Sequence, residues 1–284
     1  YTPTASKIIL AAKENGLQGA DDLLIAARKG SPLAIGHGIG EMFVGSDAIA
    51  LSPMTDQITY LEEGDWAVVT RNSLEIRDIN GELANRAVTT IHVDAGSTDK
   101  GGFKHFMSKE IAEQPAVLSD ALGHYLGADG ALSLSGEALD FTTIDRLTMV
   151  ACGTAFYACV VAKYWFEQIA GLPVEVDVAS EFRYREPPIS PRTAALFVSQ
   201  SGETADTLAA LRYCRDRADR ILSVVNVPES SIARESDLAL PIYAGVEVGV
   251  ASTKAFTCQL LTLAALVLKA ARDRGRLAPE AEAK

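Results

Sequence analysis

Residues 199–204 place three hydroxyl side chains and a glycine in one short segment, Ser-Gln-Ser-Gly-Glu-Thr. The segment follows an apolar run at residues 194–198, which is typical of a buried strand, and precedes a helical pattern that begins at Ala205. A helix start offers unpaired backbone N–H groups and the positive end of the helix dipole, and a glycine lets a ligand approach the backbone closely. These residues therefore predict a binding site for a phosphate or another small anion.

Two other strand-to-helix connections offer hydroxyl groups in the same way, one at residues 152–154 and one at residues 250–254. One serine at a helix start is most often only an N-cap, but connections of this kind in one parallel sheet meet at the same edge. We therefore predict a neutral polar pocket for a phosphorylated, hydroxyl-rich small molecule. The candidate binding residues are Cys152, Gly153, Thr154, Ser199, Gln200, Ser201, Gly202, Thr204, Val250, Ala251 and Ser252.

The charged residues near these connections leave alternatives open. Lys254 could pair with a phosphate or could be a solvated lysine in the first helical turn. We expect Glu203 to stabilise the helix terminus rather than to act as a general base. Arg183 and Arg185, at the end of the second predicted strand of the sheet, could reach an anion or a partner subunit, or could form structural ion pairs.

From about residue 144 onward, apolar strand-like runs alternate with helical patterns, which predicts an α/β fold with a parallel, doubly wound sheet. The predicted strands cover residues 147–151, 174–179, 194–199, 221–227 and 238–243. The predicted main helices cover residues 155–169, 205–217 and 255–272. Ligands of such sheets bind at the carboxyl ends of the strands, where the hydroxyl-bearing connections should lie.

Residues 23–94 have a different character, because short β-branched runs are separated by turn signals, and this pattern predicts a β-meander. The pair Asn80-Gly81 between two alternating runs predicts a hairpin. Residues 94–104 are polar and glycine-rich and are placed in a linker. A helix is expected to begin at His105 and to stop before Pro115.

The predicted division of the chain follows from these patterns. Residues 1–20 remain unassigned, apart from a short helical pattern at residues 8–13. The remaining parts are a β-rich domain at residues 21–94, a linker and helix at residues 95–120, and the α/β domain at residues 121–284.

Composition disfavours several classes of function. The net charge of −11 and the pI near 4.9 disfavour binding to a nucleic-acid backbone. The four cysteines form no CxxC pair, which indicates core thiols in a reducing cytosol, and the four histidines are too scattered to predict a metal cluster. The longest apolar run, residues 260–268, is too short to span a bilayer, and no signal peptide is visible. We expect a cytoplasmic protein with no metal, no cofactor, and no membrane or nucleic-acid partner.

Several motifs resemble the glutamine:fructose-6-phosphate amidotransferase family, also called the glucosamine-6-phosphate synthases. The motifs that resemble the family's first sugar-isomerase (SIS) lobe lie at residues 152–154, 180–185, 199–207, 234–237 and 249–257. Residues 26–33 and 61–65 resemble the later part of its N-terminal-nucleophile glutaminase domain, and residues 109–115 resemble the segment between the two domains. The resemblance covers roughly residues 21–272 and implies a flavodoxin-like SIS sheet preceded by the β-rich end of a glutaminase domain.

The resemblance also implies a reaction, in which the parent enzyme converts fructose 6-phosphate and glutamine to glucosamine 6-phosphate and glutamate. It implies that the phosphate is held by Ser199, Gln200, Ser201 and Thr204, and that the sugar is contacted by Thr154, Val250, Ala251 and Ser252. Position 155 is alanine where many relatives carry serine, which removes one hydroxyl. A homodimer is implied as well, since SIS active sites usually border a partner subunit.

The chain departs from the family pattern at both catalytic centres. The family's glutaminase nucleophile is an N-terminal cysteine, whereas this chain begins with Tyr1 and has no cysteine before Cys152. The second SIS lobe, which supplies the family's isomerase general base, ring-opening histidine and Schiff-base lysine, has no counterpart before Lys284. We therefore expect no catalytic residue in this chain, sugar-phosphate binding without turnover, and apolar exposure along the helix predicted at residues 255–272.

Two other functions remain alternatives. A non-catalytic SIS module that senses a sugar phosphate would more often carry a DNA-binding helix pair, and no basic helix-turn-helix precedes the predicted sheet. A nucleotide-binding α/β oxidoreductase would carry a glycine fingerprint after the first strand and an acidic residue after the second, and both are missing.

Overall fold

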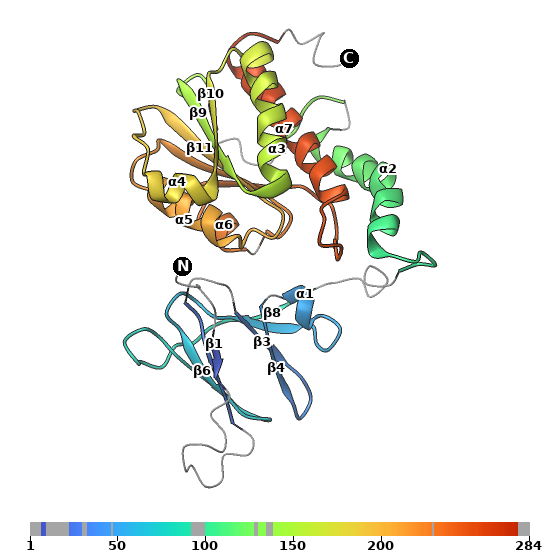
Figure 1. Ribbon diagram of the computed structural model, residues 1–284, viewed down its shortest axis with the longest axis vertical. Helices are drawn as coiled ribbons and strands as arrows, with labels where there is room; N and C mark the ends of the chain where they lie inside the picture. Colours follow the sequence, from blue (N-terminus) through green and yellow to red (C-terminus); the bar gives the residue numbers. More distant parts are fainter. Residues whose placement is uncertain are drawn as a thin grey trace. The chain divides into compact units, whose positions relative to one another are not determined.

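The computed structural model describes residues 7–9, 23–29, 33–46, 48–91, 100–127, 130–134, 139–228 and 230–277. The chain divides into two compact units, Tyr1–Asp99 and Lys100–Lys284 (Figure 1).

The first unit is built from two antiparallel sheets of short strands. Each sheet has four strands, in the order β1-β2-β6-β7 and in the order β4-β3-β5-β8. The elements are β1 (Lys7–Ile9), β2 (Leu24–Ala27), β3 (Ala34–His37), β4 (Met42–Gly45), α1 (Ala48–Leu51), β5 (Gln57–Tyr60), β6 (Trp66–Val69), β7 (Leu74–Arg77) and β8 (Val88–Thr90).

The predicted single meander is wrong for this unit. In a meander each strand pairs with its neighbour along the chain, but β2 pairs with β6 and β3 pairs with β5. Short apolar runs do not specify their partners, because pairing is decided by contacts between segments distant in sequence. The helix predicted at residues 8–13 is also wrong at its start, because residues 8 and 9 belong to the strand β1. The remainder of this predicted helix lies outside the described residues.

The predicted turn at Asn80-Gly81 is confirmed. Gly81 has a φ of 81°, and the chain reverses so that Arg77 and Leu83 form an antiparallel bridge. The returning arm is this single bridge rather than a full strand.

The second unit has the predicted α/β fold. Its five-stranded sheet is parallel, with the order β10-β9-β11-β12-β13. The strands are β9 (Arg146–Ala151), β10 (Val174–Val178), β11 (Thr193–Ser199), β12 (Arg220–Val225) and β13 (Leu238–Pro241). Every residue of β11 is buried, which explains its unbroken apolar run. In register, Val198 lies opposite Ala151 and Ser199 opposite Val225, so these strands end at one edge.

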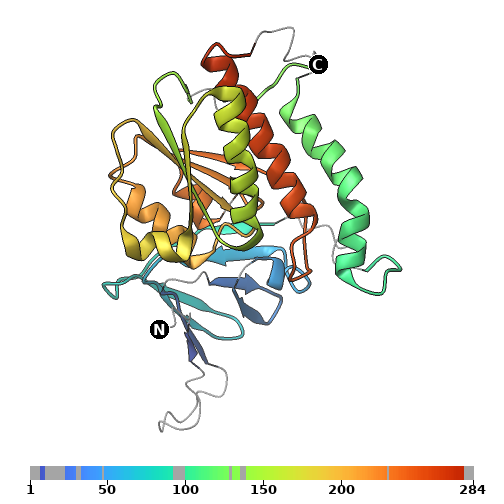
Figure 2. The ribbon, with the colours of Figure 1, turned by 45° about the horizontal axis from the view of Figure 1, so that its top comes forward.

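Helices cover both faces of this sheet (Figures 1 and 2). On one face pack α3 (Gly153–Trp165), its π-helical continuation η3 (Phe166–Ala170) and α7 (Lys254–Asp273), with α2 (Phe106–Tyr125) against α7. On the other face pack α4 (Ala179–Arg185), α5 (Ala205–Cys214) and α6 (Ser231–Arg234). Residues 179–185 were expected to end a strand, but they form α4, whose Phe182 is buried in the second core.

The helix α2 runs through Pro115, so the predicted stop before this proline is wrong. A proline has no N–H to donate to the carbonyl four residues earlier, here that of Ile111. The Nε2 atom of Gln114 lies 3.4 Å from this oxygen and donates to it from the solvent side. Packing against α7, with Ala121 and Tyr125 buried, favours continuation of the helix.

The helix α7 is the central helix of one layer of the second unit. By length and composition it could cross a membrane, with a mean hydropathy of 1.4 in its most apolar window, and 61% of that window is buried inside the protein. The prediction concerned only the apolar run at residues 260–268, whereas the helix that contains this run is 20 residues long. A buried core helix passes the same test as a membrane span.

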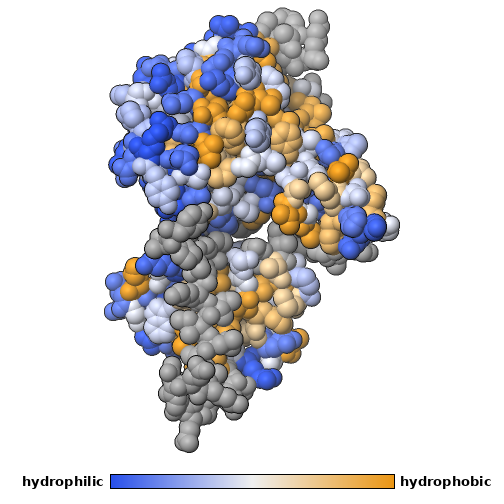
Figure 3. Space-filling view, viewed as in Figure 1, coloured by the Kyte–Doolittle hydropathy of each residue, from blue (hydrophilic) through white to orange (hydrophobic). Residues whose placement is uncertain are grey.

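Apolar exposure was expected along α7 but occurs elsewhere. Among the described residues, no large hydrophobic side chain of α7 is exposed, because α2 and α3 cover it. Exposed apolar side chains lie instead on α2, with Met107 and Ile111, and on α3, with Tyr157 and Tyr164. Figure 3 shows hydrophobic side chains at the surface in the regions of these two helices.

Candidate functional site

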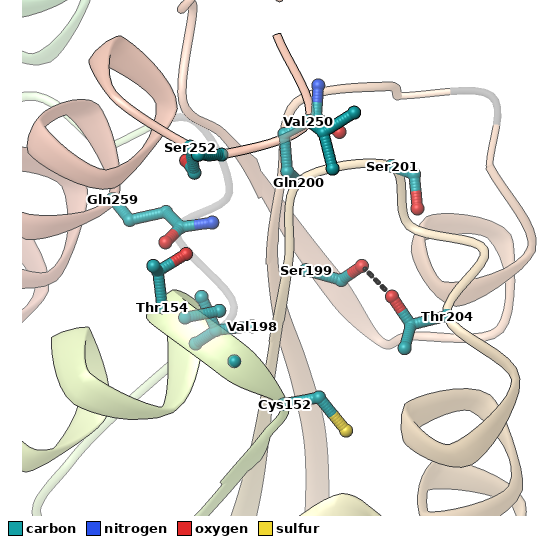
Figure 4. A pocket seen from close by; sticks show the side chains of 13 residues that line it. Cys152, Thr154, Val198, Ser199, Gln200, Ser201, Thr204, Val250, Ser252 and Gln259 are labelled. Carbon is teal, nitrogen blue, oxygen red and sulfur yellow. Dashed lines mark hydrogen bonds between the residues drawn. The ribbon is translucent and has the colours of Figure 1, made fainter.

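The three hydroxyl-bearing connections converge on one pocket of about 410 Å³. It lies where β9 passes into α3, where β11 passes into α5, and where the chain enters α7 (Figure 4). All of the predicted binding residues line it except Gly202, which belongs to the second connection. The lining residues are Cys152, Gly153, Thr154, Ala155, Val198, Ser199, Gln200, Ser201, Thr204, Val250, Ala251, Ser252 and Gln259.

Two hydroxyl groups of the second connection form a pair. The Oγ atom of Ser199 lies 2.9 Å from Oγ1 of Thr204 and also accepts the N–H of Gly202 at 3.0 Å (Figure 4). If Ser199 donates to Thr204, the Thr204 proton remains for a ligand; if Thr204 donates, the Ser199 proton remains. One proton of the pair is therefore available to an anion in either arrangement.

Backbone geometry holds this connection in a tight turn. Gly202 has a φ of 65°, which favours glycine, and its carbonyl accepts the N–H of Ile232 at 3.0 Å. A Cβ atom at this position would lie 1.9 Å from Oγ of Ser230, so the turn sits directly against the start of α6. Glu203 reaches the same helix, where its Oε1 accepts the N–H of Ser231 at 2.7 Å.

Glu203 thus stabilises a helix start, as expected, but it is the start of α6 rather than that of α5. The residue at the N-cap of α5 is Thr204. The Oε2 atom of Glu203 has no hydrogen-bond partner in the described part of the chain. A carboxylate held against a helix start is stabilised by the helix dipole, and the orientation of Glu203 follows from this.

The third connection differs from the other two because a carboxylate already occupies the start of its helix. Oε1 of Glu247 accepts the N–H groups of Thr253 and Ala255 at 2.7 and 3.2 Å, and Oε2 accepts the hydroxyl of Ser252 at 3.1 Å. These groups of α7 are engaged within the protein. The N-terminal turns of α3 and α5 are therefore the better candidates for an anion.

The cationic residues near the pocket are held in ion pairs. Lys254 is 5% exposed and its Nζ lies 2.7 Å from Oε2 of Glu113, so of the two alternatives the solvated lysine is wrong. Arg183 pairs with Asp206 in the first turn of α5 at 2.8 Å, and Arg185 pairs with Asp177. The structural ion-pair alternative is thus the one these two arginines adopt. None of these residues lines the pocket.

Gln259 lines the pocket but was not predicted from the sequence. It lies on α7, and in Figure 4 its amide is directed toward Thr154 and the open pocket. It is 1% exposed, and its Oε1 has no hydrogen-bond partner among the described residues. A buried amide oxygen without a donor costs free energy, and a ligand group that donates a hydrogen bond to it could offset this cost. The available signal was a polar residue within the mostly apolar helix predicted at residues 255–272.

The cysteines separate into one thiol at the pocket and three core thiols. Cys152 is half-buried and lines the pocket, whereas Cys159, Cys214 and Cys258 are buried. Burial raises the pKa of Cys159 above its ordinary range, that of Cys214 to about 12, and that of Cys258 to about 11. Within the described ranges, no group of three or more His, Cys, Asp or Glu side chains could hold a metal ion.

Comparison with known proteins adds sequence relationships to this geometry. Residues 140–269 match the SIS domain model. Over 261 residues the chain is 58% identical to the glutamine–fructose-6-phosphate aminotransferase (isomerizing) of Brucella abortus biovar 1 (strain 9-941), an alignment that covers 92% of this chain and 43% of that protein. The enzyme of the same name from Rhizobium meliloti (strain 1021) is 56% identical over 260 residues, with 91% and 43% covered.

Solved structures give a consistent result. The C-terminal domain of glucosamine-fructose-6-phosphate aminotransferase from Francisella tularensis superposes with a TM-score of 0.63 and 44% identity, covering 66% of this chain and 52% of that chain. Glucosamine-6-phosphate deaminase from Thermotoga maritima superposes with a TM-score of 0.50 and 25% identity, covering 63% and 51%. The chain spans less than half the length of the curated relatives it matches. Residues 140–269 are therefore a SIS domain, and more than nine-tenths of the chain is similar in sequence to one part of the glutamine–fructose-6-phosphate aminotransferases.

Proposed function

We propose that the pocket of the second unit binds the phosphate and sugar of fructose 6-phosphate or glucosamine 6-phosphate. The observation that carries this proposal is the convergence of three hydroxyl-bearing connections on one uncharged pocket at the carboxyl ends of a parallel sheet. A neutral site of hydroxyl and N–H donors suits a sugar phosphate, because it can hydrogen-bond both the anion and the sugar hydroxyls.

The phosphate is assigned to the second connection. Ser201 and Thr204 line the pocket beside the first turn of α5. The hydrogen bond between the Ser199 and Thr204 hydroxyls uses one of their two protons and leaves the other for a ligand. Gln200 adds an amide at the pocket wall. The sugar is assigned to the other connections, with Thr154 on α3 and Ser252 before α7.

We further propose that the parent enzyme of this chain converts fructose 6-phosphate and glutamine to glucosamine 6-phosphate and glutamate. The support is the identity of 58% over 92% of the chain with an aminotransferase of that name. The β-rich first unit is assigned to the end of a glutaminase domain, and the protein to a cytoplasmic homodimer. No charged side chain lines the pocket in the described part of the chain, which favours binding without proton transfer by this chain alone.

Calorimetric titration of the chain with fructose 6-phosphate in phosphate-free buffer tests the proposal. Binding should depend on the phosphate, so unphosphorylated fructose should give no comparable heat. The pair Ser201→Ala and Thr204→Ala removes two hydroxyl donors and should weaken binding by about tenfold or more. The matched control, Ser119→Ala with Thr143→Ala, removes two exposed hydroxyls outside the pocket. Equal affinity of both double variants would contradict the assignment of the phosphate.

A further inference from the structure

We propose that Glu110 on α2 is a positioning residue that fixes the loop at residues 247–252, which leads into the third connection of the pocket, in its binding conformation. This inference rests on the proposed function, because it assigns a role in sugar-phosphate binding to a residue outside the pocket. Glu110 lies more than a hundred residues before the loop it contacts, and neither it nor its neighbours on α2 line the pocket.

The contact is a buried carboxylate that accepts from two consecutive backbone groups. Glu110 is 2% exposed, and its Oε1 accepts the N–H of Val248 at 2.7 Å and that of Gly249 at 3.0 Å. Burying a carboxylate is costly unless it is hydrogen-bonded, and bonds from N–H groups to a charged acceptor are among the stronger ones. The two N–H groups immediately precede Val250, which lines the pocket.

The second oxygen of the same carboxylate lies against a glycine. A Cβ atom on Gly249 would meet Oε2 of Glu110 at 2.5 Å, closer than any van der Waals contact allows. Oε2 itself has no hydrogen-bond partner in the part of the chain that the structure describes. The absence of a side chain at position 249 therefore lets Glu110 reach both N–H groups, and the two residues form one matched contact.

Side-chain burial does not hold the tip of this loop. The Val250 side chain is fully exposed, at 106%, and Ala251 is exposed as well. The tip lies between two polar anchors, the pair of N–H groups on Glu110 and the Glu247 carboxylate at the start of α7. A loop without apolar anchoring takes its conformation from these hydrogen bonds, so loss of the Glu110 anchor should leave the tip mobile.

Two substitutions separate hydrogen-bond acceptance from charge. Glu110→Ala removes the acceptor, whereas Glu110→Gln keeps an oxygen in place of Oε1 and removes only the charge. In Glu110→Ala, the amide hydrogens of Val248 and Gly249 should exchange faster, and affinity for fructose 6-phosphate should fall by about tenfold. Glu110→Gln should keep slow exchange and bind within about threefold of the unsubstituted chain. Asp120→Ala, an exposed change on the same helix, is the matched control and should alter neither quantity.

Both measurements use the full chain. Mass spectrometry follows the hydrogen exchange at Val248 and Gly249, and calorimetry measures the affinity for fructose 6-phosphate. Wild-type exchange rates at Val248 and Gly249 in Glu110→Ala, or equal loss of affinity in both Glu110 variants, would overturn the proposal. If Glu110→Ala does not fold, Gly249→Ala carries the test, because its methyl group displaces the carboxylate from the other side and should give the same faster exchange. Failure of the unsubstituted chain to bind fructose 6-phosphate would contradict the proposed function alone, since the exchange rates still report the anchor.

Discussion

A single methyl group at Gly202 should disrupt the turn to which the proposed function assigns the phosphate. The Cβ atom of Gly202→Ala would lie 1.9 Å from Oγ and 2.4 Å from Cβ of Ser230, and the backbone has a φ of 65°. The left-handed backbone costs a non-glycine residue about 1–2 kcal/mol. Forcing a methyl group into a filled space costs about 1–3 kcal/mol more. We therefore expect the free energy of unfolding of the second unit to fall by about 2–5 kcal/mol.

Gly153→Ala provides the matched comparison. Gly153 also has a left-handed backbone, with a φ of 57°, but a Cβ atom there would meet no heavy atom within 4 Å. This variant should show the conformational cost of about 1–2 kcal/mol alone. Adding Ser230→Gly to Gly202→Ala removes both clashing atoms and should recover the steric part, about 1–3 kcal/mol.

Urea unfolding followed by tryptophan fluorescence measures these differences. The chain has two tryptophans, Trp66 in the first unit and Trp165 in the second, so a Trp66→Phe background reports on the second unit alone. Equal destabilisation by Gly202→Ala and Gly153→Ala, or no recovery on adding Ser230→Gly, would refute the argument that contact with Ser230 dictates glycine at position 202.

Two further predictions follow from individual side chains. Cys152 is the half-buried thiol at the pocket, so iodoacetamide should modify it before the three buried cysteines. Fructose 6-phosphate should slow this modification. Mass spectrometry that finds another cysteine modified first would contradict the prediction. Burial lowers the pKa of His37 below its ordinary value of 6.5, so the unfolded chain binds more protons and the first unit should lose stability as pH falls through about 6.5. In a Trp165→Phe background, thermal unfolding at pH 7.5 and about 5.5 should show a smaller loss for His37→Gln, and an equal loss would count against the argument.

The parallel sheet was predictable because each of its strands is buried on both faces. β11 is a continuous buried run flanked by turn residues, and such a run is read directly from sequence. The pairing in the first unit could not be read this way, because β2 and β6 are joined only by contacts across some forty residues. The continuation of α2 through Pro115 depends on packing against α7, and a rule applied to neighbouring residues cannot include it.

The residues of the candidate site also differ in whether a local sequence pattern predicts them. Hydroxyls and glycines at helix starts carry a local signal, and the structure brings the hydroxyl side chains together in one pocket, although their role in binding stays a proposal. Gln259 and Glu110 carry no such signal, because neither lies at a helix start. Gln259 lines the pocket from within α7, and Glu110 contacts a loop distant in sequence. Neither alternative for Lys254 included an ion pair within the protein, since its partner Glu113 lies on α2, far away along the chain.

If the pocket binds a phosphorylated ligand as proposed, its uncharged lining means that the pH dependence of binding comes from the ligand rather than from the protein. Among the lining residues in the described ranges there is no Asp, Glu, His, Lys or Arg. A phosphate monoester changes from one negative charge to two near pH 6, and this protonation is then the main acid–base event at the site near neutral pH. Fixed dipoles and hydroxyls also act over short distances, so added salt screens their attraction for an anion less than it would screen that of a basic surface patch. Such a pocket can retain a phosphorylated ligand on a strongly acidic protein without attracting nucleic acid.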